Sequence, residues 1–165
     1  MSHRGDRSTR RQQGVTSVEV AIVGLLALLV VFAVLEVGRA LFVFNALEEG
    51  TRRGVRVAVV CPVGDPTPIA EAAIFNGSGG GPTSSLVGGL TTGHVRVEYL
   101  GETGDVLADP ENTDFGRIAF VRVRIEGFEH RLLIPLFMTT FTMPEFPTVL
   151  PRESLGVTRT EISFC

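Results

Sequence analysis

A run of sixteen residues without a charged side chain, at positions 20–35, is the feature that most constrains this chain of 165 residues. A helix needs about 20 apolar residues to cross the hydrocarbon core of a bilayer. Residues 15–35 supply 21 of them if Glu19 is tolerated or paired. The run therefore predicts one transmembrane helix, which we place at residues 15–38.

The residues in front of this run are basic. Residues 1–14 contain four Arg and one Asp. Because positive charge that flanks a membrane helix stays on the cytoplasmic side, we expect the N-terminus inside and the chain beyond the helix outside the cytoplasm. A cleaved secretory signal is an alternative, but such a signal has a shorter apolar region and small residues at the cut. Here the run ends in the sequence LEVGR.

A glycine and a glutamate mark the start of the apolar run. Glu19 lies five residues after Gly14, in the sequence RRQQG-VTSVE. This arrangement resembles the class III signal peptide of type IV pilins and pseudopilins. The resemblance implies that prepilin peptidase cuts between Gly14 and Val15, removes the leader 1–14, and leaves Glu19 to pair with the new amine of a neighbouring subunit. The alternative is a Glu19 that reaches toward lipid headgroups and a Gly14 that is an ordinary loop glycine.

The sequence after the apolar run narrows this resemblance. Residues 35–43 (LEVGRALFV) and 50–56 (GTRRGVR) are similar to the TadE-like family of pseudopilins of tight-adherence (Flp, type IVc) pilus systems, and residues 156–161 (GVTRTE) are similar to its C-terminal ending. Membership implies a minor pilin or pseudopilin that helps to assemble a Tad pilus, with a part in cell adhesion, surface attachment and biofilm formation.

The resemblance also implies a location and partners. The location is the bacterial cytoplasmic membrane, crossed once, with incorporation in a pilus as a further state. The partners are the prepilin peptidase, other Tad pseudopilins, the Flp pilin, the membrane platform proteins and the lipid bilayer. An uncleaved, signal-anchored binding domain unrelated to pili is the alternative function.

The helical pattern continues beyond the membrane segment. Apolar residues recur at steps of three and four residues as far as Leu47, which predicts one helix over residues 16–59, with residues 39–60 as its extracytoplasmic continuation. Small residues recur every four positions on this continuation, at Ala46, Gly50, Gly54 and Ala58. Such a strip lets another backbone approach closely. Either the chain's own sheet or a neighbouring subunit would fill it.

Residues 61–165 are expected to form a small α+β domain. A short helix is predicted at 69–75, and the Gly-rich segment 76–93 reads as a mobile loop. Alternating apolar residues predict antiparallel strands, with a Pro-broken loop over 141–151. The three strands are expected at 94–100, 117–125 and 156–164. The fold class is thus a long N-terminal helix that covers a small antiparallel sheet, as in pseudopilins.

Composition and motifs argue against catalysis and cofactors. The chain has no Lys and a net charge of -3, which does not favour nucleic acid as a partner. We find no nucleophile or zinc motif, and we expect no cofactor. Cys61 and Cys165 form either a disulfide or two free thiols. Four carboxylates in one loop offer calcium a weak candidate site, although acidic residues commonly solvate turns. These are Asp105, Asp109, Glu111 and Asp114.

Overall fold

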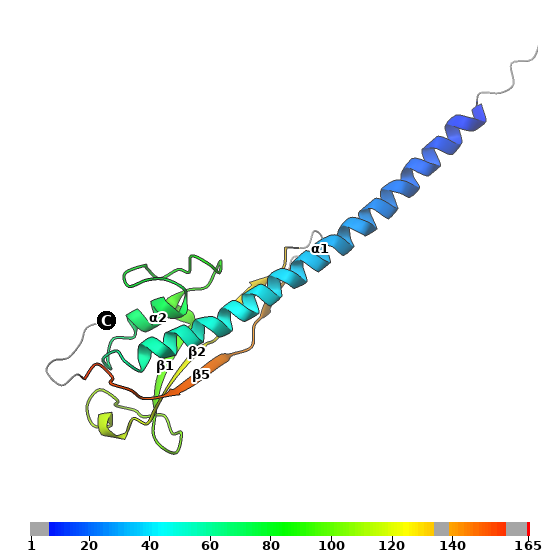
Figure 1. Ribbon diagram of the computed structural model, residues 1–165. Helices are drawn as coiled ribbons and strands as arrows, with labels where there is room; N and C mark the ends of the chain where they lie inside the picture. The colour runs from blue at the N-terminus through cyan, green and yellow to red at the C-terminus, as the bar shows by residue number, and fades with distance from the viewer. Residues whose placement is uncertain (1–6, 134–138, 158–164) are drawn as a thin grey trace, which may run out of the picture. The chain divides into compact units, whose positions relative to one another are not determined.

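The computed structural model describes residues 7–133, 139–157 and 165, and it has an α+β fold (Figure 1). This confirms the predicted fold class. The two helices are α1 (Arg7–Ala58) and α2 (Thr67–Ala73), and the short 3-10 turns are η1 (Thr92–His94) and η2 (Phe115–Arg117). The strands are β1 (Val95–Leu100), β2 (Phe120–Ile125), β3 (Glu129–Arg131), β4 (Thr140–Thr142) and β5 (Phe146–Pro151).

The chain divides into two compact units. The first, which we call the apolar unit, comprises residues 1–40 and 132–139. The second, which we call the sheet unit, comprises residues 41–131 and 140–165. Helix α1 contributes residues to both units, so one helix supplies two different local environments.

Helix α1 begins earlier than predicted and ends within one residue of the expected place. Pro62 follows its C-terminal end and cannot continue a helix. The carbonyl groups left free at that end accept hydrogen bonds from a distant segment: the Leu155 amide donates to Val59 and the Gly156 amide to Val60. Gly156 has φ +78°, and a Cβ atom there would lie 2.5 Å from Cγ of Pro62. The cap therefore requires glycine.

The sheet unit is built on a three-stranded antiparallel sheet in the order β1-β2-β5. Val97 lies opposite Val123, and Ile125 lies opposite Phe146. The apolar side chains of this face form one buried cluster with the second half of α1 and with α2. Strands β3 and β4 pair separately as a short antiparallel ribbon.

The third strand of the sheet lies in a different place from the one predicted. Strand β5 occupies part of the segment that we expected to be a Pro-broken loop. Pro147 and Pro151 are tolerated because β5 is an edge strand, where one side of the backbone needs no ladder hydrogen bonds. Of the strand expected at 156–164, residues 158–164 lie outside the described residues, and Gly156 lies in a turn.

Candidate membrane anchor and assembly helix

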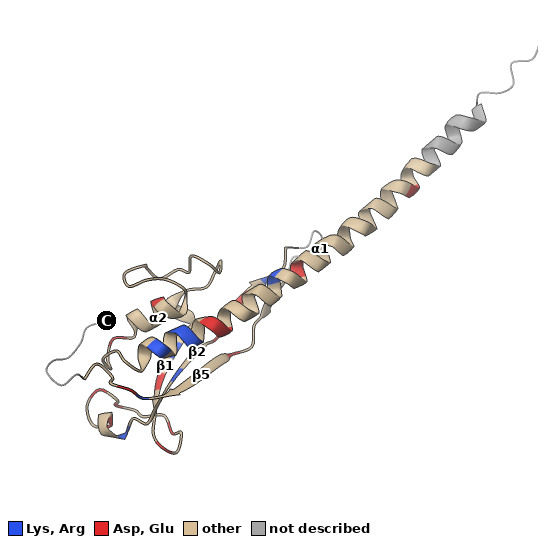
Figure 2. Cartoon of the chain, in the orientation of Figure 1, with Lys and Arg blue, Asp and Glu red and all other residues tan. Residues whose placement is uncertain are grey.

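From Val18 to Val37, all but one of the large apolar side chains of α1 are exposed, Leu29 being half-buried. Among the described residues, this is the one helix that is long and apolar enough to cross a membrane, and none of its apolar window is buried. Val20, Leu28 and Leu35 are each more than half exposed. Figure 2 shows that charged residues are sparse along this part of α1 and denser in the part beside the sheet. One apolar N-terminal helix of this kind fits a single-pass membrane anchor.

The predicted processing and pairing residues all lie on this helix. Gly14 and Val15 belong to α1, and only the backbone is described for these two residues. Glu19 is exposed one turn further along. Cleavage between Gly14 and Val15, and pairing of Glu19 with an amine, remain predictions.

A second carboxylate, on the last part of α1 within the apolar unit, is shielded from solvent. The Glu36 side chain is only 8% exposed. Its Oε1 accepts a hydrogen bond from Nε of Arg39 at 3.1 Å, and its Oε2 accepts one from the amide of Leu133 at 3.4 Å. The sequence predicts no role for Glu36, although this residue falls inside the predicted membrane segment 15–38. The i,i+3 spacing of Glu36 and Arg39 was the available signal.

The strip of small residues on α1 is filled by the chain's own residues. A Cβ atom on Gly50 would lie 2.3 Å from the carbonyl oxygen of Ala73, and one on Gly54 would lie 2.9 Å from Cβ of Ala73 and 3.1 Å from Cγ1 of Val123. Ala46 and Ala58 are buried. Helix α2 therefore occupies most of the strip, with β2 behind it. Two glycines in a helix interior are explained by this close approach.

The two cysteines are joined in the structure. Cys61 and Cys165 form a disulfide with a Cα–Cα distance of 5.8 Å, across a sequence separation of 104 residues. The bond ties the segment after α1 to the residue at position 165, next to the cap made by residues 155 and 156.

A buried carboxylate holds the Gly-rich loop 76–93. Glu71 of α2 is 6% exposed and accepts hydrogen bonds from the amides of Gly79, at 2.7 Å, and Gly81, at 3.2 Å. The Asn76 side-chain amide donates to the carbonyl of Thr83 at 2.8 Å. The loop is therefore more constrained than its glycine content indicates. The amides of Gly79 and Gly81 already bind the Glu71 carboxylate, so they are not open to a phosphate group.

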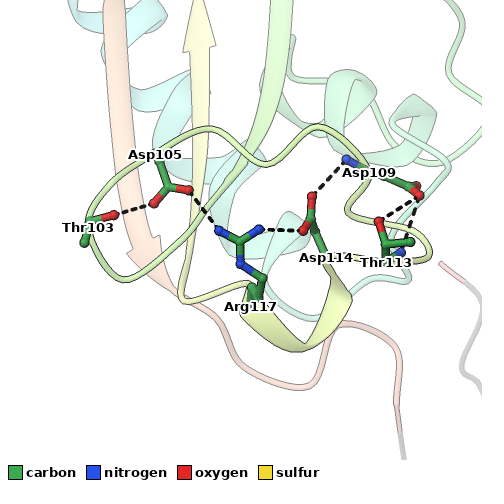
Figure 3. Close-up of polar contacts among 6 residues, drawn as sticks. All are labelled: Thr103, Asp105, Asp109, Thr113, Asp114 and Arg117. Carbon is green, nitrogen blue, oxygen red and sulfur yellow. Dashed lines mark hydrogen bonds and ion pairs between the residues drawn. The ribbon is translucent and has the colours of Figure 1, made fainter.

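Three of the four acidic loop residues proposed for calcium, Asp105, Asp109 and Asp114, have other partners (Figure 3). Arg117 pairs with Asp114 at 2.7 Å and with Asp105 at 3.5 Å. A hydrogen bond from Thr103 lowers the pKa of Asp105, and one from Asn112 lowers the pKa of Asp109. The fourth, Glu111, lies near Gly64, where a Cβ atom would be 3.2 Å from the Glu111 carboxyl carbon. Within the described part of the chain, no group of ligating side chains gathers for a metal ion.

The comparison with known families gives a match to part of helix α1. Residues 14–56 match the family model whose description is TadE-like protein. This N-terminal segment is TadE-like. The match confirms the resemblance over those residues, and the TadE-like family is a structural, non-enzymatic family of Tad pilus systems. No curated protein and no solved structure matches the chain significantly.

The TadE-like segment coincides with the structural features of α1. It begins at Gly14, takes in Glu19 and Glu36, and ends at residue 56, after Gly54. It therefore includes both the exposed apolar stretch and most of the strip that receives α2. Residues 1–13 and 57–165 lie outside the match, and the second of these ranges carries the sheet and the disulfide.

Proposed function

We propose that this protein is a membrane-anchored minor pilin or pseudopilin of the TadE type, which takes part in assembly of a Tad/Flp pilus. One observation carries the proposal. The TadE-like segment begins at Gly14 and contains the uncharged stretch of α1 at positions 20–35, whose large apolar side chains are exposed on all sides apart from the half-buried Leu29. A helix that is apolar on every face needs lipid or other apolar helices around it.

The proposed mechanism is assembly without turnover of a substrate. The basic leader 1–14 stays on the cytoplasmic side, and prepilin peptidase cuts between Gly14 and Val15. The new amine at Val15 lies about 6 Å along the helix from Glu19, at 1.5 Å per residue. Pairing of Glu19 with such an amine of a neighbouring subunit neutralises two charges that hydrocarbon disfavours. Other Tad pseudopilins and the Flp pilin supply the neighbours.

The sheet unit is the part that the anchor presents outside the cytoplasm in this proposal. An extracytoplasmic location supports the disulfide between Cys61 and Cys165, because disulfides persist in oxidising compartments. The platform proteins of the membrane and the lipid bilayer are the partners of the apolar unit. Adhesion, surface attachment and biofilm formation follow from incorporation in the pilus.

The test is the mass of the membrane form. The full chain is produced with and without an active prepilin peptidase, and the N-terminus is read by mass spectrometry. We expect a start at Val15 only when the peptidase is present. Gly14→Leu should block processing, and Gly24→Ala is the matched control, because it changes a glycine of the same helix with nothing within 4 Å. Retention of residues 1–14 beside an active peptidase would favour an uncleaved signal anchor.

A separate variant tests the pairing of Glu19 with the amine of a neighbouring subunit. Glu19→Gln keeps the shape and removes the charge, so we expect normal processing and a loss of the protein from the sheared pilus fraction. Glu48→Gln is the control, because Glu48 is an exposed carboxylate on the same helix that pairs with Arg52. Wild-type incorporation of Glu19→Gln would remove the pairing mechanism and leave the family assignment intact.

A further inference from the structure

The position of Glu36 relates the segment after β3 to the predicted edge of the bilayer. From Val15 to Glu36 a helix rises about 32 Å, which is close to the thickness of the hydrocarbon core. Glu36 also follows directly on the last residue of the uncharged run. If α1 crosses the membrane as proposed above, Glu36 lies where hydrocarbon ends.

A charged group at that depth needs partners, and the structure supplies two from the apolar unit. Arg39 pairs with one carboxylate oxygen of Glu36, and the backbone amide of Leu133 donates to the other. Hydrogen bonds to a charged acceptor are stronger than those between neutral groups. The contact brings the backbone of Leu133 to the same level as Glu36, although the two residues are 97 positions apart in the sequence.

The Leu133 side chain is exposed to solvent. It is 63% exposed, as are its apolar counterparts on α1, with Leu35 at 63% and Val37 at 60%. The amide of Leu132 donates to the carbonyl of Thr139, which joins the two described ends of this segment. No charged residue occurs in the sequence between Arg131 and Glu145. The exposed Leu133 side chain thus adds to the apolar surface of the helix that we assign to the bilayer.

We propose that this corner of the apolar unit is a second lipid-contacting element, in which Leu133 inserts into the outer interface of the bilayer beside α1. The lipid-facing corner is defined by Leu132, Leu133 and Thr139 together with Glu36 and Val37. Lipid is the occupant because the corner continues the exposed apolar surface of α1 at the depth where that surface meets the headgroups. Glu36 acts as the positioning residue that holds the Leu133 backbone there. The inference rests on the membrane anchoring in the proposed function.

The chain contains no Trp, so a single introduced Trp reports its own surroundings. The full chain carrying Leu133→Trp is reconstituted in vesicles of phosphatidylcholine and phosphatidylglycerol, with and without bromine at both the upper and the lower parts of the acyl chains. Val106→Trp is the matched control, because Val106 is 55% exposed next to Asp105 in the acidic loop of the sheet unit. Leu26→Trp, on the exposed helix, reports the anchor itself.

We expect brominated lipid to lower the emission of Leu133→Trp at least twofold and to leave Val106→Trp within a tenth of its unquenched value. We expect Glu36→Ala to reduce the quenching of Leu133→Trp, because it removes the acceptor of the Leu133 amide. Quenching of Leu26→Trp without quenching of Leu133→Trp would overturn the inference and leave the anchor in place. No quenching of Leu26→Trp would overturn the anchor first and the inference with it.

Two further outcomes are decided by the same samples. The emission of Leu133→Trp could shift equally with and without bromine, and the shift could disappear on dilution with lipid. This result would mean that another copy of the chain covers the corner, and it would overturn the inference. If Leu133→Trp fails to form the disulfide of the wild type, Thr139→Trp replaces it. Thr139 is exposed at the other end of the same segment, and the twofold criterion applies to it unchanged.

Discussion

Two parts of helix α1 share one backbone and have opposite surroundings. From Val18 to Val37 the large apolar side chains are exposed on every face, whereas from Val43 to Ala58 the apolar residues are buried on one face. The opposite face of the second part carries the pairs Glu48 with Arg52 and Glu49 with Arg53. The distribution of apolar residues around a helix, more than their number, therefore decides whether lipid or the chain itself covers it.

The largest expected effect comes from the disulfide, which lies in the sheet unit just after α1 and has no counterpart in the apolar unit. We expect Cys61→Ser with Cys165→Ser to lower the free energy of unfolding of the sheet unit by about 4 kcal/mol, since the disulfide closes a loop of about a hundred residues. Urea unfolding of the full chain in detergent micelles, followed by circular dichroism, measures it. The helical signal of the apolar part should survive at urea concentrations that unfold the sheet unit. If the helical signal of the apolar part and the signal of the sheet unit were lost together, the two parts of α1 would not differ in stability.

A pair of leucine truncations separates the two parts of the helix. Leu47 is fully buried, and we expect Leu47→Ala to cost about 3 kcal/mol of unfolding free energy in the same urea experiment. Leu26 is 58% exposed, so Leu26→Ala should leave the unfolding of the sheet unit unchanged. If both truncations cost the same, α1 would have one kind of environment throughout.

A pair of glycine substitutions tests the same contrast through close approach. Alanine favours a helix over glycine by about 1 kcal/mol, so Gly38→Ala, with nothing within 4 Å, should be neutral or stabilising. At Gly50 the new Cβ would meet the backbone oxygen of Ala73 at 2.3 Å. We expect Gly50→Ala to lower the unfolding free energy by about 2 kcal/mol because α2 must shift. A gain in stability at Gly50 would show that α2 does not sit on the strip.

The smallest effect concerns the only Tyr of the chain, in the core of the sheet unit. Burial raises the pKa of Tyr99 from 10.0 to about 12, with a smaller contribution from the charge of Glu111. The unfolded chain then ionises first as pH rises, so stability is complete below pH 10 and falls between pH 10 and about 12. The loss is about 1 kcal/mol at pH 11.

Phenolate absorbance reads this ionisation directly, without interference from another Tyr or from Trp. Tyr99→Phe should remove the alkaline fall in stability that belongs to this group. A titration midpoint near 10 in the folded protein would show that the ring is solvated.

The sequence was sufficient where the determining contacts are local. The apolar run and Pro62 located most of α1 and its C-terminal end, although the helix begins at Arg7 and not at residue 16, and alternation of apolar residues located β1 and β2. Strand β5 was not predicted, because Pro147 and Pro151 argue against a strand unless that strand is known to lie at the edge of a sheet. Edge position depends on strand order, which single-sequence periodicity does not contain.

The site residues show the same limit. The spacing of Gly50 and Gly54 predicted a close neighbour, but the neighbour is mainly α2, whose seven residues carry little periodicity of their own. The contact between Glu36 and Leu133 joins residues that are 97 positions apart in the sequence, so no local sequence pattern predicts it. The acidic loop looked like a set of cation ligands because the Arg117 that pairs with it lies twelve residues beyond Asp105.

The bond between Cys61 and Cys165 also sets the route of mechanical load. A pull applied between α1 and position 165 passes through the two sulfur atoms, because the covalent bridge is far shorter than the chain that it encloses. The sheet, α2 and the loops between the cysteines then carry none of the tension. In the proposed pilus, this connection would let the protein transmit force along its helix while its folded part stays unstretched.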